Sequence, residues 1–565
     1  MSASRESRVH PARIHWVREG PPAPGARYVL YWIQINQRAR MNDALDFAVE
    51  QADALGLPVL AYQGLRPDYP GANDRIHTFI LEGAVDLAAE LAEKKIRHLF
   101  HLERRRAAAA GLLASLAREA ALVVTDHFPV FIIPGQTRAL ARQIERPVAA
   151  VEASCIVPPD LFARAEVGAR TLRPKMHRVL HEHLLPREEI APRRSSLGIA
   201  IPFPHPMTGL EAEERCWLDL DAARVGGGKG LKGTAGIISS VLGRKEDPRQ
   251  QTRSAGKLKD GRSAQSISAS GEIERSRAPD FSGQVSASHD RDLIAEWVAS
   301  CGIDHRIAPS PVYRGGSREA RARLARFVAE RLPHYAETHN DPAREGTSGL
   351  SPYLHFGQIS AAEVALAALS SLPAGPAGVH EALTKALADR ETPIGAFIEQ
   401  LVVRRELAFN FCERNPRFSS IEGLPGWAQR TLAEHGADPR AALYAREALE
   451  WSETEDEVWN AAQTELRLTG VIHNRLRMIW GKKILEWTDA PAEAVAIMLD
   501  LHERYALDGR DPNTYASILW CLGLHDRPFG PARKVIGLVR PMSSEIARKK
   551  FDFAAYVARL RGYER

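Results

Sequence analysis

The chain has 565 residues, of which 44% are hydrophobic and 26% are charged, and its formal net charge is +5. This composition is ordinary for a soluble globular protein of about two to four domains, and the small positive charge permits nucleic-acid binding without requiring it. No apolar run reaches the ~18 residues of a membrane span, and the N-terminus lacks the apolar centre of a secretory signal, so we expect a cytoplasmic protein that does not enter a membrane.

The five cysteines are far apart and form no C-x-x-C pair. This spacing argues against a disulfide framework, a zinc site and an iron–sulfur cluster. We therefore predict reduced, mostly buried thiols and no metal site.

After an N-terminal tail over residues 1–25, residues 26–190 alternate between apolar β-branched runs and amphipathic patterns. Helices are predicted after each of the first three strands, and the strands are "RYVLYWIQI", "PVLAYQ", "IRHLFHL", "ALVVTDH" and "PVAAVEA". This alternation predicts a doubly wound, Rossmann-like parallel sheet with helices on both faces. No G-x-G-x-x-G follows the first strand, so the usual dinucleotide fingerprint is absent.

Residues 191–310 are expected to form an interdomain linker, in which residues 225–289 are a low-complexity insertion rich in Gly, Ser, Lys, Arg and Gln. Its "GGGKG" lacks the spacing of a phosphate loop, and no predicted strand precedes it. Residues 311–565 carry 3.6-residue periodicity and almost no strand signal, which predicts an α-helical domain with a loop insertion at "SLPAGPAGVH".

Two short motifs of the helical half could hold a ligand. Thr347, Ser348 and Ser351 gather hydroxyl groups just before a predicted helix start, where they could bind phosphate or form a plain N-cap with a turn. Asp508, in "LDGRDPN", could bond its own backbone or pair with a cation such as Arg477. Neither motif alone decides between its two alternatives.

The tryptophans also allow two interpretations. Trp480 and Trp487 lie seven residues apart, so on a helix both rings share one face, and Trp459 lies 21 residues before Trp480. Such a stripe is typical of a core, but the same rings could form a row that moves electrons.

The motifs occur in a fixed order behind an α/β domain and a linker: "TSGLSPYLHFGQIS", "VVRRELAFNFC", "VWNAAQ", "RMIWGKKILEW", "LDGRDPN" and "LHDR". This set resembles the photolyase/cryptochrome flavoproteins, and in detail the class II cyclobutane-pyrimidine-dimer photolyases. The resemblance runs from "VLYWIQINQRARMN" to "RKKFDFAAYV" and leaves out the low-complexity insertion and the Pro/Gly loop. It implies FAD in the helical domain, light-driven repair of UV-damaged DNA, and an antenna chromophore, a deazaflavin or a folate, as an option in the α/β domain. We expect a monomer.

The resemblance also implies roles for individual residues, in three groups. The FAD contacts are Tyr335, Thr347, Ser348 and Ser351 at the phosphates and the ion pair of Arg477 with Asp508 near the isoalloxazine ring. The electron relay runs from the inner Trp480 through Trp459 to the outer Trp487. The lesion contacts are Met478, Trp520, Arg404 and the residue at position 400.

Several positions depart from the family pattern. Gln400 stands where "F-L-E-E-L" has a carboxylic acid, and Glu399 is one residue off, about 100° around an α-helix. His502 stands where the family has the asparagine that faces flavin N5, Phe409 replaces an aspartate, and Ile479 replaces a tyrosine. A glutamine cannot give up a proton, and a histidine near the flavin could be neutral or cationic.

These departures leave more than one function open. Dimer repair is the first hypothesis, in which Gln400 and His502 make repair competence doubtful. The alternative is a cryptochrome-like photoreceptor or repurposed flavoprotein with weak or no repair. A DNA-binding scaffold that has lost flavin is the third, and the retained "TSGLS" motif argues against it.

Overall fold

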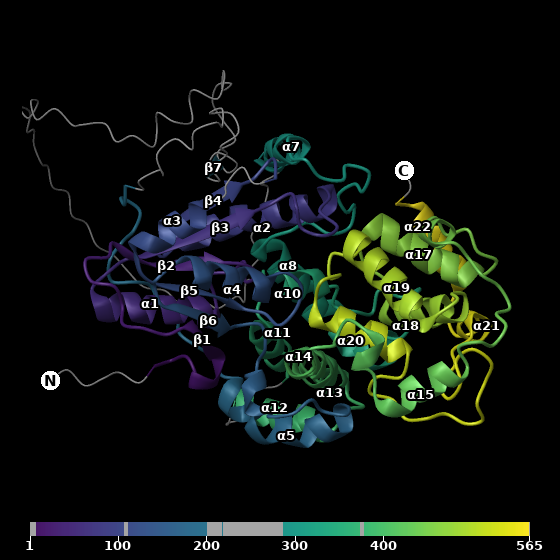
Figure 1. The fold of residues 1–565 in the computed structure, drawn as a ribbon. Helices are drawn as coiled ribbons and strands as arrows, with labels where there is room; N and C mark the ends of the chain where they lie inside the picture. Colours follow the sequence, from purple (N-terminus) through teal and green to yellow (C-terminus); the bar gives the residue numbers. More distant parts are fainter. Residues whose placement is uncertain (1–6, 107–110, 201–216, 219–285, 373–377, 564–565) are drawn as a thin grey trace, which may run out of the picture.

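The computed structural model describes residues 7–106, 111–200, 217–218, 286–372 and 378–563 (Figure 1). Of the low-complexity insertion predicted over 225–289, all but residues 286–289 lies outside these ranges. Within them, every helix is too short or too polar to cross a bilayer. Four of the five cysteines lie in the described ranges, and all four are buried thiols.

The N-terminal half is built on a seven-stranded sheet of order β1-β6-β5-β2-β3-β4-β7. Its inner strands are all parallel: β2 (Tyr28–Ile33), β3 (Val59–Leu65), β4 (Arg97–Leu102), β5 (Ala120–His127) and β6 (Val148–Glu152). The chain leaves β2 toward β3 on one side and later fills the other side with β5 and β6. This topology confirms the predicted doubly wound sheet.

The two edge strands were missed by the sequence analysis. β1 (Ile14–Arg18) follows a short turn, η1 (Pro11–Arg13), and pairs antiparallel with β6, while β7 (Trp217–Leu218) pairs antiparallel with β4. The prediction of a tail over residues 1–25 is therefore wrong for η1 and β1. β7 has only two residues, and β1 (IHWVR) is a partly exposed edge strand without the apolar run that marks the inner strands, so its pairing depends on tertiary contacts.

Helices cover both faces of the sheet (Figure 1). α1 (Asp43–Leu55) and α2 (Asp74–Glu93) bury apolar side chains against one face, and α3 (Leu112–Glu119) and α4 (Ile133–Gln143) against the other. α4 was not predicted, because its "IPGQ" start has the Pro-Gly pattern of a turn.

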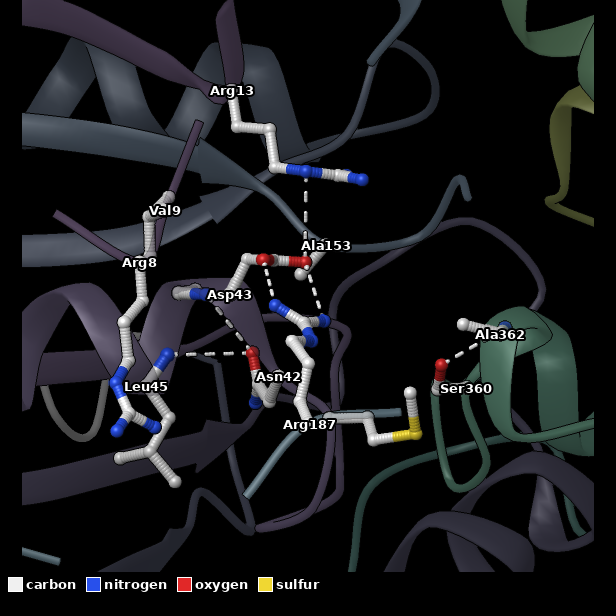
Figure 2. A network of polar contacts seen from close by, with 12 residues as sticks. Arg8, Val9, Arg13, Asn42, Asp43, Leu45, Ala153, Arg187, Ser360 and Ala362 are labelled. Carbon is white, nitrogen blue, oxygen red and sulfur yellow. Dashed lines mark hydrogen bonds and ion pairs between the residues drawn. The ribbon is translucent and has the colours of Figure 1, made fainter. Parts of the chain in front are cut away.

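Buried ion pairs anchor the N-terminal strand to the sheet (Figure 2). Asp43, which begins α1, accepts a hydrogen bond from Arg187 at 2.5 Å and lies 3.7 Å from Arg13. Arg13 also bonds Glu152 at the end of β6 at 2.5 Å. The charges are paired, as burial requires, and they fix the N-terminal segment beside α1.

The C-terminal half is helical, as predicted, and its described part contains no strand. Its helices are α8 (Ser317–Arg326), α9 (Tyr335–Thr338), α10 (Ser351–His355), α11 (Ala361–Leu369), α12 (Gly378–Ala388), α13 (Pro393–Ile398), α14 (Arg405–Arg414), α15 (Gly426–Glu434), α16 (Arg446–Glu450), α17 (Glu457–Thr469), α18 (Asn474–Glu486), α19 (Pro491–Tyr505), α20 (Pro512–Cys521), α21 (Ser544–Arg548) and α22 (Phe553–Arg561). A π-helical turn, η6 (Glu399–Arg404), joins α13 to α14. α5 (Ala169–His183) and α7 (Ser286–Ala299) lie between the two halves in the chain.

Buried polar side chains tie the two halves together. Arg75 of α2 donates to the carbonyls of Leu466 and Arg467 in the last turn of α17 and to that of Tyr505, which ends α19. Glu406 of α14 accepts the backbone N–H of Ile156 at 2.6 Å. Because α17 and α19 also carry predicted site residues, these contacts position the site against the α/β half.

Candidate functional site

Residues that the sequence analysis predicted at a cofactor meet between α18, α10 and the turn after α19. Arg477 Nη2 lies 3.3 Å from Asp508 Oδ1 and 3.2 Å from Oδ2, and Ser351 also hydrogen-bonds this carboxylate. Burial would raise the pKa of Asp508, but the charge of Arg477 together with the other groups around the carboxylate outweighs burial, so the pKa is lowered. The carboxylate and the guanidinium are therefore both ionised and form a buried ion pair.

His502 of α19 lies beside this ion pair and has no exposed surface. Neither of its ring nitrogens has a hydrogen-bond partner among the described residues. Burial, together with the charge of Arg477, lowers its pKa to about 3, although Asp508 acts in the opposite direction. A neutral imidazole with two open nitrogens is costly to bury, and it fits a site completed by a bound polar group.

A basic cleft of about 260 Å³ opens near the hydroxyl motif. Thr347, Ser348 and Gly349 line it, and Gly349 has φ +65°, which an L-residue adopts only with strain. The cations of the lining are Arg323, Arg326, Arg331, Arg344 and Arg559. They outnumber the acids, Glu345 and Glu465, so the cleft suits an anionic group such as a phosphate.

Tyr335 does not line this cleft. It is buried among aromatic rings, stacked on His339 at 4.6 Å between centroids and edge-on to Phe327 and Phe397 at 5.9 and 5.3 Å. In the structure Tyr335 therefore packs within an aromatic cluster and is not part of the cleft lining that contains Thr347 and Ser348.

The predicted tryptophans form a row that leads away from His502. Trp480 contacts His502 edge-on at 5.3 Å and donates its indole N–H to Gln463 at 2.8 Å. Trp459 donates to the Trp480 carbonyl at 3.0 Å and meets Trp487 edge-on at 5.5 Å. All three rings are buried, so the row is also part of the core. The same side chains therefore fit both interpretations, a core stripe and a row that moves electrons.

Sequence analysis missed the next ring of this row. Tyr444 packs edge-on against Trp487 at 5.1 Å and is partly exposed, and its hydroxyl accepts the backbone N–H of Glu455 at 3.2 Å. Trp487 itself is only 8% exposed, so Tyr444 lies nearer to solvent. Tyr444 lies in a loop without periodicity, where no sequence signal connects it to Trp487.

The predicted lesion contacts lie at the junction of η6 and α20. The guanidinium of Arg404 lies over the Trp520 ring at 5.6 Å. Met478 is half-buried, and its carbonyl lies 3.8 Å from the Sγ of Cys521, which follows Trp520. Arg404, Trp520 and Met478 are thus brought together by elements far apart in the sequence.

Gln400 and Glu399 differ sharply in environment. Gln400 is exposed, whereas Glu399 is buried and accepts two hydrogen bonds from Arg173 at 2.9 and 2.6 Å, with Arg404 at 3.4 Å. Burial would raise the pKa of Glu399, but the bonds and charge of Arg173 lower it. The segment is π-helical, so the offset of 100° expected for an α-helix does not apply, and the carboxylate is held by arginines.

A second cavity, of about 110 Å³, lies where β2 and β5 end against the helical half. Among the described residues, the side-chain carbonyls of Gln34 and Gln63 have no hydrogen-bond partner there. Two nitrogens of Arg510 also have none in the described part of the chain. The Arg510 guanidinium also lies over the rings of Tyr69 and Phe131. Such amide edges and flat walls at a topological switch point suit a planar heteroaromatic ligand.

Comparisons with known proteins agree with this arrangement. The family model described as DNA photolyase matches residues 29–193. The chain is 33% identical over 555 residues to the deoxyribodipyrimidine photo-lyase of Methanothermobacter thermautotrophicus, covering 98% of this chain and 99% of that protein. It is 31% identical to the deoxyribodipyrimidine photo-lyase of Oryza sativa subsp. japonica, covering 97% of this chain and 90% of that one.

Solved structures share the fold at low sequence identity. A bacterial class III photolyase from Agrobacterium tumefaciens matches with a TM-score of 0.55 and 17% identity, covering 95% of this chain and 87% of that one. A Synechocystis cryptochrome matches with a TM-score of 0.56 and 13% identity, covering 97% of this chain and 89% of that one. At these identities, the likeness concerns the architecture alone.

Proposed function

We infer the function from kinship and geometry together: the chain belongs to the photolyase/cryptochrome family, and we propose that it is a class II-like deoxyribodipyrimidine photolyase. In this proposal it repairs cyclobutane pyrimidine dimers in UV-damaged DNA by light-driven electron transfer. The observation that carries the proposal is one buried junction. There the Arg477–Asp508 ion pair and the open nitrogens of His502 meet the inner end of the tryptophan row.

The proposed cofactor is FAD, held in the helical half. When bound and reduced, FAD supplies the light-excited electron that splits a dimer. Thr347 and Ser348, with the arginines of the basic cleft, would bind its phosphates, and Arg477 and Asp508 would present fixed charges to its ring. Neutral His502 can donate one hydrogen bond and accept another, which its unpartnered nitrogens support. The aromatic packing of Tyr335 supports only an indirect contribution.

We further propose that the aromatic row is an electron path. Trp480, Trp459 and Trp487 are the inner, middle and outer members, and Tyr444 extends the path toward solvent. The hydrogen bonds of the Trp480 and Trp459 indoles hold these rings in one orientation, as a fixed path requires.

The proposed substrate contacts are Trp520, Arg404, Met478 and Gln400. Trp520 offers a flat face to a flipped-out dimer, and Arg404 places a cation beside it. Gln400 can donate a hydrogen bond but not a proton. The chain would act on DNA as a monomer.

The interdomain cavity supports the proposal of an antenna chromophore. Its glutamine amides and the stacked Arg510 fit a planar deazaflavin or folate, and nothing in the cavity distinguishes the two. We keep an antenna-type α/β domain over residues 26–190, to which the structure adds η1 and β1, a linker over 191–310 and an FAD-binding catalytic domain over 311–565.

A specific observation favours a second function, that of a cryptochrome-like photoreceptor with little repair. The carboxylate of Glu399 is bound to Arg173 and Arg404, and Gln400 has an amide in place of a carboxylate. Within the described part of η6, no other carboxylate is available to protonate a dimer. This chemistry would leave light absorption intact and reduce the yield of splitting.

Two measurements on the purified chain test the proposal. A flavin absorption band in the blue is expected, and its absence would contradict the family's chemistry here. The reduced protein is then illuminated with a dimer-containing oligonucleotide. We expect repair that is lost in Trp520→Ala and kept in Trp451→Ala, a control at a tryptophan that is 54% exposed. Photoreduction without any repair would favour the photoreceptor.

A further inference from the structure

We propose that the loop from Arg164 to Arg170, which enters α5 from the α/β half, is a second DNA-contacting surface that grips the duplex beside the lesion. This inference rests on the proposed function, because the expected ligand is the DNA that carries the dimer. The loop lies outside the residues that the family resemblance assigned to substrate. Its position, rigidity and surface chemistry each support the role.

The loop is linked to a proposed lesion contact, Trp520, through His525. His525 bonds the Val167 carbonyl through Nδ1 at 2.9 Å, and its ring packs edge-on against Trp520 at 5.4 Å. Burial lowers the pKa of His525 to about 4, so the ring is neutral and Nδ1 carries the donated hydrogen. Val167 is therefore one histidine away from the ring proposed to contact the dimer.

A second connection runs from the start of α5. Arg173 bonds Glu399 through two hydrogen bonds, and Glu399 pairs with Arg404, whose guanidinium lies over Trp520. One connection thus reaches Trp520 from the middle of the loop, at Val167, and the other from Arg173 in the helix that follows it. The loop and the lesion contacts thus form one continuous rim.

The loop is held rigid from below. Buried Asn410 of α14 donates its amide to the Arg164 carbonyl at 3.1 Å and accepts the Glu166 N–H at 2.7 Å. Lys175 also pairs with the Glu166 carboxylate, so this acid presents no free negative charge to an approaching phosphate. Rigid presentation lowers the entropic cost of binding.

The outward side chains suit duplex DNA. Arg164 and Arg170 are exposed, and neither pairs with a carboxylate in the described parts of the chain. Between them Val167 is 75% exposed, the highest value for a large apolar side chain among the described residues. A single exposed valine is ordinary. An exposed valine between two unpaired arginines, however, matches the way proteins contact a minor groove or a gap between unstacked bases. In such contacts the cations bind phosphates, and the apolar side chain fills the space between the bases.

The cations are tested by the salt dependence of binding. Arg164→Gln and Arg170→Gln are compared with Arg142→Gln, a control at an exposed arginine of α4. For a duplex with one dimer, each loop variant should lower the slope of log Kd against log salt concentration by about 1. The control should leave the slope unchanged. Unchanged slopes in both loop variants would overturn the inference.

The valine is tested by comparing duplex and single-stranded ligands. Val167→Ser, which removes the apolar side chain without adding a charge, should weaken binding of the dimer-containing duplex by about tenfold. It should leave binding of the single-stranded dimer oligonucleotide unchanged, because that ligand has no partner strand to wedge apart. The control is Leu197→Ser, at a leucine that is 49% exposed in the segment beside Lys95. Equal weakening of both ligands, or of neither, would contradict the wedge.

The outcomes separate this inference from the proposed function. If the wild-type chain prefers damaged duplex and the loop variants bind as it does, only the loop role fails. If the wild type binds duplex without preferring damage and the loop variants weaken that binding, the loop role holds and the repair function fails. If the wild type binds no duplex, both are contradicted.

Discussion

The tryptophan row and the lesion rim differ in how far the protein interior constrains them. In the row, the indoles of Trp459 and Trp480 are buried, and each N–H group is paired inside the core. On the rim, Gln400 is exposed, and Glu399 is held by arginines. The geometry of the row is therefore fixed by core packing. The chemistry of the rim depends instead on a few side chains that can be replaced without unfolding the protein. This contrast predicts that photoreduction is robust in this chain and that repair is fragile.

Breaking the row should have the largest effect. Trp459→Phe removes the middle ring's indole and its bond to the Trp480 carbonyl while keeping most of the core volume. We expect photoreduction of bound flavin to be abolished and flavin content to stay unchanged. The check is the loss of flavin absorption under blue light with an external reductant. Trp451→Phe, at the exposed tryptophan, should behave as wild type, and rapid photoreduction in Trp459→Phe would refute the path.

Restoring the rim should have the next largest effect. Gln400→Glu returns a carboxylic acid to an exposed position, so it should raise the repair yield several-fold. The yield is measured as dimers split per photon absorbed by the reduced protein. Glu399→Gln is the matched control: it breaks the bonds to Arg173 and should lower thermal stability without raising the yield. An unchanged or lower yield in Gln400→Glu counts against the role of this position.

His502 should make the protein sensitive to acid. Its pKa in the folded chain, about 3, lies below the ordinary value near 6.5, so the unfolded chain binds a proton that the folded chain refuses. The stability contributed by neutral His502 is complete above pH ~6.5 and is lost as the pH falls toward 3. Thermal melting of the flavin-free protein should therefore decline less on acidification in His502→Asn than in the wild type. A parallel decline in the two proteins would show that His502 does not titrate on unfolding.

The interface histidines should give a smaller effect of opposite sign. Burial would lower the pKa of His127, but its hydrogen bond to Glu413 at 2.9 Å and the nearby carboxylate charges together raise it. The stacked His15 has its pKa lowered to about 4, mainly by burial. The folding stability that protonated His127 contributes is therefore present below pH ~6.5, and it is lost as the pH rises through the raised pKa of this residue. His127→Gln should not lose this stability. Its melting temperature should therefore fall less than that of the wild type between neutral and mildly alkaline pH. A pH profile identical to that of the wild type would exclude the pair as a contributor.

Sequence patterns predicted the parallel sheet and the helical half because periodicity and caps are local signals. The helix from Asp43, for example, is capped by the Asn42 side chain at its start and by left-handed Gly56 at its end. Motif order also predicted which distant residues would meet, including Arg477 with Asp508. The contact of Tyr444 with Trp487 was beyond reach, because it joins a loop to a helix end with no periodic signal. The Glu399 bonds to Arg173 were hidden in the same way, since they depend on a π-turn and on a helix from the other half.

Two quantities measured in one sample test the central contrast most directly. Protein with oxidised FAD is illuminated with blue light and reductant in the presence of a dimer-containing duplex, and flavin reduction and dimer splitting are followed together. The account predicts complete flavin reduction and a low yield of splitting, raised by Gln400→Glu. Splitting at high yield in the wild type, or a flavin that stays oxidised, would contradict it.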